Sequence, residues 1–266
     1  MAQQVHRAVA RSLGRFVDLP DTGVAQLAQL LASPLLVKAR RKLVDEGRSQ
    51  GEFYIVLSGW LAEYRLLRDG RRQIFSFRLP GEVVGVEALL YDASLHSVAT
   101  LTPSAVAAVT WAAFDRVQRQ FPRLATALLL SRLSDNAILH EWAVNLGRRP
   151  AYQRVAHLLL ELERRLRTAG AVAGASIPFP LTQQDIADST GLTSPYVNRI
   201  LQDMRKEGLI RCSENALEIR DIAALAKAAG FRSTYLDIAP RKGWRSVTDG
   251  ARPRDPPLDE TAPAPA

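Results

Sequence analysis

Cysteine is the scarcest chemically versatile residue of this 266-residue sequence, which contains only Cys212. A single cysteine excludes an intramolecular disulfide and any zinc or iron–sulfur centre held by cysteines alone, and it favours a reducing compartment. The four histidines are scattered, and no cysteine or histidine pair has metal-ligand spacing. We therefore expect no metal site, and the sequence does not favour haem either.

Long apolar segments are also missing. The most apolar run, residues 124–130, is far shorter than the roughly 18 residues that a membrane span needs. The first residues lack an apolar core of signal-peptide length, so the pattern predicts a cytoplasmic protein with no membrane contact. The motifs of P-loop, metalloprotease and serine-hydrolase sites do not occur, and we expect the protein not to be an enzyme.

The composition is that of a globular protein with a basic surplus. Hydrophobic residues make up 47% of the chain and the net charge is +8, and this length favours more than one domain. Half of the surplus falls in residues 147–181, whereas residues 182–236 are neutral overall. Net charge alone therefore does not identify a nucleic-acid-binding segment.

The first part of the chain divides into a short helical segment and a strand-rich segment. Residues 1–34 predict a helical appendage, with a helix that Asp21 and Thr22 cap and that Pro34 ends. From residue 35 to residue 121, which we call the strand-rich domain, short apolar or alternating runs lie between glycines. The expected strands include residues 53–57, 60–66, 73–77, 97–101 and 105–110, with a hairpin turn at Asp69-Gly70. This pattern is typical of an antiparallel barrel or sandwich.

Residues 122–146 predict one long helix. Apolar or neutral side chains recur along it at a spacing of three and four residues: Leu130, Leu133, Ala137, His140 and Val144. Such a seam indicates a dimerisation helix that packs against a second copy of itself. The alternative interpretation is a single helix buried in the core.

Residues 147–236, which we call the winged-helix domain, contain the pattern of a helix-turn-helix. Pro150 follows a break and starts a helix that continues to about residue 169. Residues 182–205 fit a helix-turn-helix: Ala187 is small where the helices cross, Gly191 permits the left-handed turn, and Val197 with Ile200 faces inward. Two short strands, a wing, follow this unit. Residues 237–266 are rich in proline and poor in large apolar side chains, so we expect a disordered tail.

The order of these segments resembles the Crp/Fnr superfamily of bacterial transcription regulators. The motifs that carry the resemblance are residues 51–59, 80–85, 181–187 and 197–201. It implies an α+β fold with an N-terminal antiparallel β-barrel of the cyclic-nucleotide-binding jelly-roll type, a long dimerisation helix and a C-terminal winged helix-turn-helix. It also implies a homodimer that binds palindromic double-stranded DNA. RNA polymerase is a further expected partner.

The resemblance carries DNA-contacting roles onto individual residues. Arg199 matches the family's base-reading arginine, and Gln183 and Gln184 match positions that touch phosphates. The full set of expected DNA contacts is Thr182, Gln183, Gln184, Thr193, Ser194, Tyr196, Asn198 and Arg199. Ser194-Pro195 stands where many members have Arg-Glu, so the half-site should differ from the commonest family consensus. The alternative from the residues alone is an ordinary helical hairpin with a solvated polar face.

The expected effector pocket comprises Gly81, Glu82, His96 and Ser97. In cyclic-nucleotide-binding members an Arg-Ser pair follows the Gly-Glu element, and here the corresponding pair is His96-Ser97. Because imidazole is a poor substitute for a guanidinium fork on an anion, we expect no cyclic nucleotide, and Glu82 becomes a turn and capping residue. The lone Cys212 also excludes the iron–sulfur cluster of the oxygen-sensing branch, so we expect no cofactor.

The sequence therefore predicts a sequence-specific DNA-binding transcription regulator whose strand-rich domain responds to an unidentified signal. One alternative is a ligand-sensing or scaffold module whose winged helix binds another protein. Another is a sensor that retains affinity for cyclic nucleotides.

Overall fold

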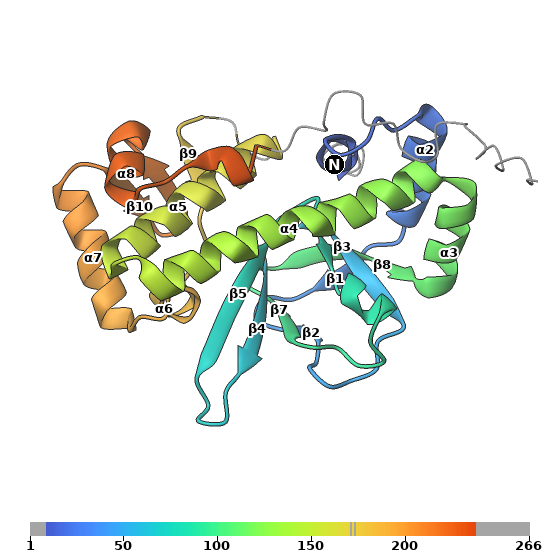
Figure 1. Cartoon of the computed structure of the whole chain (residues 1–266), viewed down its shortest axis with the longest axis horizontal. Coiled ribbons are helices and arrows are strands. Elements are labelled where there is room, and N and C mark those ends of the chain that lie inside the picture. Colours follow the sequence, from blue (N-terminus) through green and yellow to red (C-terminus); the bar gives the residue numbers. More distant parts are fainter. Residues whose placement is uncertain (1–8, 171, 173, 238–266) are drawn as a thin grey trace, which may run out of the picture.

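A computed structural model describes residues 9–170, 172 and 174–237 of the chain (Figure 1). Near the N-terminus, helix α2 covers Asp21–Leu30. The predicted cap of this helix is wrong, because Pro20 occupies the N-cap position and Asp21 is already in the first turn, where its charge favours the helix dipole. The helix also ends at Leu30, before Pro34 is reached.

The strand-rich domain consists of two four-stranded antiparallel sheets. One has the order β1 (Leu35–Val37), β8 (Ser104–Thr110), β3 (Glu52–Ser58) and β6 (Val83–Val84). The other has the order β2 (Lys42–Val44), β7 (Ser97–Thr100), β4 (Leu61–Leu66) and β5 (Arg72–Arg78). Eight strands in two facing sheets agree with the sandwich that the strand pattern predicted and with the jelly roll that the resemblance implied.

Alternation along the strands places side chains on opposite faces of the sheet. Phe53 and Ile55 of β3 pack into a core shared with α2 and the long helix, whereas Tyr54 and Val56 face the space between the sheets. Gly70 has a φ of +81°, as the predicted hairpin turn between β4 and β5 requires. A short 3₁₀ helix, η1, covers Val86–Leu89.

Two helices follow the last strand. Helix α3 covers Trp111–Gln120 and is capped by Thr110, whose Oγ1 accepts a hydrogen bond from the Ala113 N–H at 3.3 Å. Helix α4 covers Pro122–Arg148 and runs along the length of the molecule, which confirms the predicted long helix (Figure 1). Its first turns and Trp142 are buried, while Leu133 is 65% exposed.

The winged-helix domain folds as its spacing predicted. It contains α5 (Ala151–Thr168), β9 (Ser176–Pro178), α6 (Gln183–Thr190), α7 (Ser194–Lys206), β10 (Ile210–Ser213), β11 (Ala216–Ile219), α8 (Ile222–Ala229) and η2 (Ser233–Tyr235). Strands β10, β11 and β9 form a three-stranded antiparallel sheet, of which β10 and β11 are the wing. Of the expected disordered tail, residues 238–266 lie outside the described residues.

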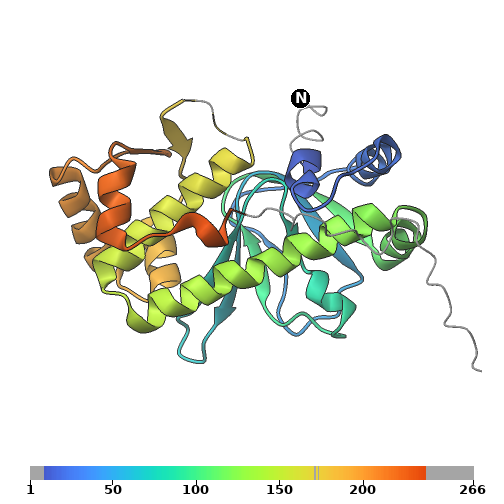
Figure 2. The same cartoon turned by 45° about the horizontal axis from the view of Figure 1, so that its top comes forward.

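One of the hydrophobic clusters contains side chains from both domains. Trp60 and Phe77 of the strand-rich domain belong to the same buried cluster as Ile186 and Val197 of the helix-turn-helix. Helix α4 runs beside both domains in each of two views (Figures 1 and 2). Among the helices of the described residues, none combines the length and the hydropathy that crossing a bilayer demands.

Candidate nucleic-acid interface

The start of α6 is fixed by a reciprocal capping box. The Thr182 Oγ1 accepts a hydrogen bond from the Asp185 N–H at 3.1 Å, and the Asp185 Oδ2 accepts one from the Thr182 N–H at 3.0 Å. The Thr182 hydroxyl also donates to the Asp185 carboxylate at 2.7 Å. Thr182 therefore positions α6, and its expected DNA contact stays a prediction.

The turn between the two helices explains the spacing found in the sequence. Gly191 ends α6 with a φ of +67°, a backbone conformation in which a Cβ atom is strained. Ala187, Val197 and Ile200 are buried where α6 and α7 pack together. Thr193 is the N-cap residue of α7 without a side-chain cap bond, and Pro195 lies in the first turn, where its missing N–H is tolerated.

Polar side chains of α6 contact those of α7. The Gln183 Nε2 donates to the Asn198 Oδ1 at 3.0 Å, and the Ser194 hydroxyl donates to the Gln184 Oε1 at 2.7 Å. Four of the expected DNA contacts are thus brought into one surface. Arg199 lies exposed on α7, and within the described part of the chain no ion pair holds it.

A groove with a volume of about 940 Å³ separates this surface from the β4–β5 hairpin. Its lining includes the expected contact residues Gln184, Thr193, Ser194 and Tyr196, together with hairpin residues 70–73. Tyr196 is 45% exposed. The first turn of α7 therefore opens onto a groove whose other wall is the β4–β5 hairpin.

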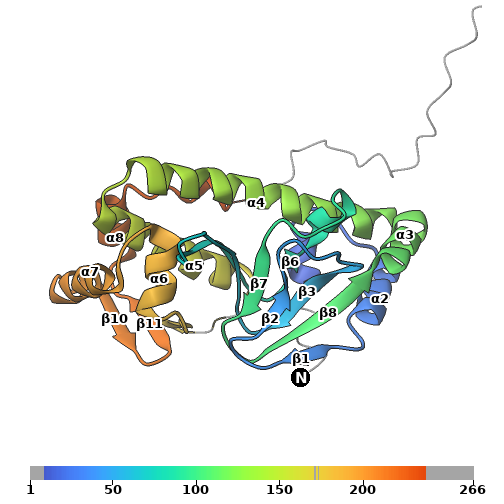
Figure 3. The ribbon, with the colours of Figure 1, turned by 90° about the horizontal axis from the view of Figure 1, so that it is seen from below.

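Two arginines of the strand-rich domain hold α6. Arg72 donates to the Asp188 Oδ2 at 2.7 Å and to the Asp185 Oδ1 at 2.8 Å, and Arg40 donates to both Asp185 oxygens at 2.9 and 2.8 Å. Burial disfavours the charged Asp185, but the hydrogen bonds from Arg40 and Thr182 outweigh it and lower the pKa of this carboxyl. The hairpin lies beside α6 when the molecule is seen from below (Figure 3). No local sequence pattern indicated this contact.

Glu82 of the expected effector pocket contacts the winged-helix domain. Its Oε2 accepts a hydrogen bond from the Leu79 N–H at 3.1 Å, which is the turn role that the sequence predicted. In addition, the Arg165 Nη2 of α5 donates to the Glu82 Oε2 at 2.8 Å, a contact that sequence reasoning missed. The Glu82 carboxylate of the expected effector pocket is thus engaged by an arginine. That the protein uses no cofactor stays a prediction.

The other expected pocket residues have different partners. The Ser97 Oγ accepts a hydrogen bond from the Glu46 N–H at 3.2 Å, and Gly81 occupies a turn with a φ of +92°. The His96 Nε2 lies 2.8 Å from the Glu87 Oε1. Burial disfavours the charged ring, but the carboxylates of Glu63 and Glu87 outweigh burial and raise the pKa of His96 to about 9. Glu82, His96 and Ser97 of the expected pocket therefore each contact different partners.

Comparisons with known proteins agree with this architecture. Residues 35–121 match the cyclic nucleotide-binding domain and residues 153–228 match the Crp-like helix-turn-helix domain. The nitrogen fixation regulation protein FixK of Rhizobium meliloti is 32% identical over 206 residues, covering 76% of this chain and 89% of the relative. The chain belongs to the Crp/Fnr family of transcription regulators.

Other Crp/Fnr regulators show the same likeness. The fumarate and nitrate reduction regulatory protein of Vibrio cholerae is 25% identical over 214 residues, covering 80% of this chain and 84% of that protein. The solved structure of FixK2 from Bradyrhizobium japonicum matches with a TM-score of 0.67 and 26% identity, over 73% of this chain and 96% of that one. The predicted fold class and the predicted function as a DNA-binding transcription regulator are confirmed. The relatives named here are regulatory proteins.

Proposed function

We propose that this Crp/Fnr regulator works as a homodimer in which α7 of each subunit reads one half of a palindromic DNA site. The observation that carries the proposal is the exposed Arg199 on α7, beside a polar surface formed with the start of α6. A guanidinium in a major groove can donate two hydrogen bonds to guanine, and the amide of Asn198 can pair with adenine. Arg199 is therefore the residue on which base recognition should depend most.

Residues at the starts of α6 and α7 would make the phosphate contacts. Gln183 and Gln184 lie in the first turn of α6, where backbone N–H groups and the positive end of the helix dipole attract phosphate. Thr193, Ser194 and Tyr196 occupy the corresponding position at the start of α7. These residues would fix the register of the protein on the duplex, whereas Arg199 and Asn198 would carry the sequence preference.

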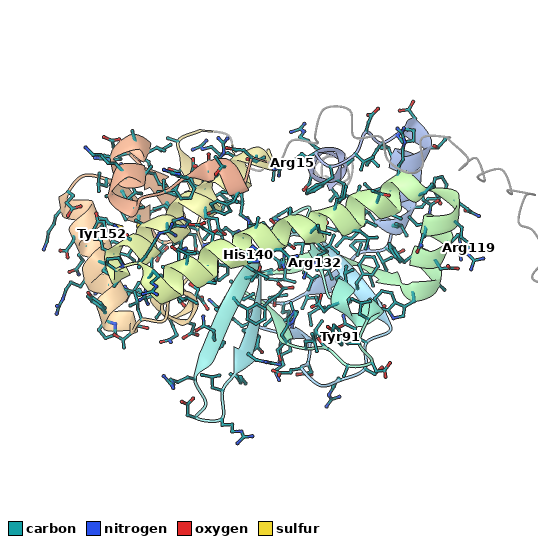
Figure 4. All side chains as sticks on the ribbon, viewed as in Figure 1. Arg15, Tyr91, Arg119, Arg132, His140 and Tyr152 are labelled. Atoms are coloured by element: carbon teal, nitrogen blue, oxygen red, sulfur yellow. The ribbon has the colours of Figure 1, made fainter. Side chains whose placement is uncertain are left out.

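An exposed apolar row on α4 supports the homodimer. Leu129, Leu133 and Val144 are 43%, 65% and 46% exposed, although they lie on one helix with large buried side chains. Of the predicted seam, Leu130 and Ala137 are half-buried, and His140 is exposed near the middle of the molecule (Figure 4). A second copy of α4 would cover this row. We expect the dimer to act in the cytoplasm, with RNA polymerase as a further partner.

The Arg199→Ala substitution tests the base-reading role. Duplexes selected from a random pool by the native protein supply the operator, and fluorescence anisotropy measures the affinity. We expect a loss of about 1–3 kcal/mol for the operator and little change for random duplex. Arg205→Ala, at the other end of the same helix, is the control. Equal operator affinity in the Arg199→Ala and native proteins would overturn the assignment.

A further inference from the structure

Three side chains that are distant in the sequence converge inside the strand-rich domain. Glu63 lies on β4, Glu87 in η1 and His96 just before β7. One ligand atom from each lies within 4.8 Å of the other two. The His96 Nε2 is 2.8 Å from the Glu87 Oε1 and 3.5 Å from the Glu63 Oε1.

The atoms that face one another in this cluster lack aligned hydrogen bonds. The Glu63 side chain is only 2% exposed, and while its Oε2 pairs with Arg78, its Oε1 is buried without a hydrogen-bond partner. The Glu87 Oε1 and the His96 Nε2 are buried as well and have no hydrogen-bond partner, although they lie 2.8 Å apart and would form an ion pair if the ring is protonated. Buried polar atoms without partners are costly, and an ion or a water is a common reason for them.

We propose that Glu63, Glu87 and His96 bind a divalent first-row transition-metal ion such as Zn²⁺ or Mn²⁺. Ions of this class take imidazole nitrogen and carboxylate oxygen at about 2.0–2.2 Å, which places neighbouring ligand atoms roughly 2.8–3.6 Å apart. The separations of 2.8 and 3.5 Å at His96 fall within that range. A mixed nitrogen and oxygen ligand set favours these ions over Mg²⁺ and Ca²⁺, which prefer oxygen alone.

The charges around the three side chains are compatible with a bound cation. Arg78 contacts Glu63 and Asp135, and Arg132 lies 2.8 Å from Asp135, 3.4 Å from the Glu87 Oε2 and 3.9 Å from the Glu63 Oε1. The three carboxylates of this cluster thus face two guanidinium groups, which leaves one negative charge for His96 to balance when its ring is protonated. A proton on His96 or a bound cation removes that uncompensated negative charge.

The site is connected to the long helix through Arg132. Arg132 lies on α4 above the strand-rich domain, and its Nη1 also donates to the Val83 carbonyl at 3.1 Å (Figure 4). A cation on Glu87 would compete with Arg132 for this carboxylate and so act directly on α4. The regulatory meaning of this contact rests on the proposed function, whereas the cation site itself does not.

Calorimetric titration of the full chain, stripped with EDTA, with ZnCl₂ and with MnCl₂ tests the site. We expect one high-affinity ion per chain for at least one of the two metals, and at least a tenfold weakening in Glu63→Gln and in His96→Gln. His140→Gln, which removes an exposed imidazole from α4, should leave the affinity unchanged. Circular dichroism checks folding, and Glu87→Gln replaces Glu63→Gln if loss of the Arg78 partner unfolds the chain.

Several outcomes would overturn the site. One is the absence of stoichiometric binding of either metal, with a water or a protonated His96 between the carboxylates in a crystal structure grown with Zn²⁺. Another is binding that the Glu63→Gln, Glu87→Gln and His96→Gln variants do not weaken. DNA binding is measured separately by anisotropy, so failure of the Arg199 experiment would remove the proposed function and leave this titration unaffected.

Discussion

At the level of single residues, a buried histidine links the stability of the fold to pH. His157 of α5 is 0% exposed, with its Nδ1 3.2 Å from the Asn145 amide nitrogen and its ring stacked on Tyr235 at 6.0 Å between centroids. Burial and then the charge of Arg149 lower the pKa of His157 to about 4, although Glu141 opposes them. The fold therefore requires a neutral ring.

The lowered pKa of His157 predicts that the protein loses stability in mild acid. Between pH 6.5 and about pH 4 the unfolded chain binds a proton that the folded chain excludes, so the free energy of unfolding falls as the pH is lowered through this window. The difference between the pKa values of His157 in the unfolded and folded chain corresponds to a loss of up to about 3 kcal/mol in the free energy of unfolding. Urea unfolding at pH 7 and pH 4.5 measures the change.

The control is His157→Gln, in which the side chain cannot titrate. Its free energy of unfolding should fall less between the two pH values than that of the native protein, even if it is lower at both. An equal fall in the two proteins would show that other groups cause the acid sensitivity.

At the level of elements, α4 has two different faces. Leu124 and Leu128 are buried against the strand-rich domain, and Trp142 donates a hydrogen bond to the buried Glu161 of α5 at 2.8 Å. On the outer face, Leu133 leaves 65% of its surface in solvent. An exposed apolar row of this kind on a monomer typically marks an interaction surface.

Leu133→Asp should convert the homodimer to a monomer. Two-fold symmetry places each introduced carboxylate in an apolar interface near its copy, where burial and repulsion both oppose association. Light scattering coupled to size-exclusion chromatography measures the mass. Leu66→Asp, at a residue 56% exposed on β4, is the matched control and should remain dimeric. A dimeric Leu133→Asp protein would contradict the role of this face.

At the level of the whole molecule, buried ion pairs join the two domains. Arg165 of α5 donates to the Glu161 carboxylate at 2.9 Å, to the Phe77 carbonyl at 2.6 Å and to Glu82 at 2.8 Å. Other basic residues of the 147–181 segment also have acidic partners, since Arg149 pairs with Glu141 of α4 and the exposed Arg164 pairs with Asp237. These arginines stabilise the fold and the domain contact more than they supply positive charge for DNA.

Arg165→Met should therefore destabilise the whole chain by about 3–5 kcal/mol. The substitution keeps most of the apolar contacts but leaves the buried Glu161 without its cationic partner. The free energy of unfolding in guanidinium chloride measures the loss. Arg164→Met, on the same helix but 49% exposed, should cost no more than about 1 kcal/mol. A similar cost for both variants would show that the buried Arg165 adds no more stability than the exposed Arg164.

Local patterns in the sequence predicted much of the fold. The strands of residues 52–58 and 104–110, the long helix and the helix-turn-helix all follow from apolar periodicity and from turn residues such as Gly70 and Gly191. Periodicity acts over a few residues, so it is visible without tertiary structure. The prediction of the α2 cap was wrong because several residues near position 21 are able to begin a helix, and the backbone at Pro20 decides which one does.

The polar clusters could not be predicted in the same way. Glu63, Glu87 and His96 show no common spacing, and the sequence indicated no metal site, because these residues meet only when β4, η1 and the start of β7 pack together. The same holds for Arg72 with Asp188 and for Arg165 with Glu82, whose partners belong to different domains. Long-range ion pairs depend on topology and not on neighbouring residues.

The sequence by itself thus determined the order of the elements, the family and the surface of α7 that we propose reads DNA, because each depends on short-range spacing. Tertiary structure alone decided which charges are buried, how the β4–β5 hairpin holds α6, and which side of α4 stays exposed. The physical reason is that burial and charge pairing are properties of the packed chain. They are set when distant segments meet, and no local pattern records them.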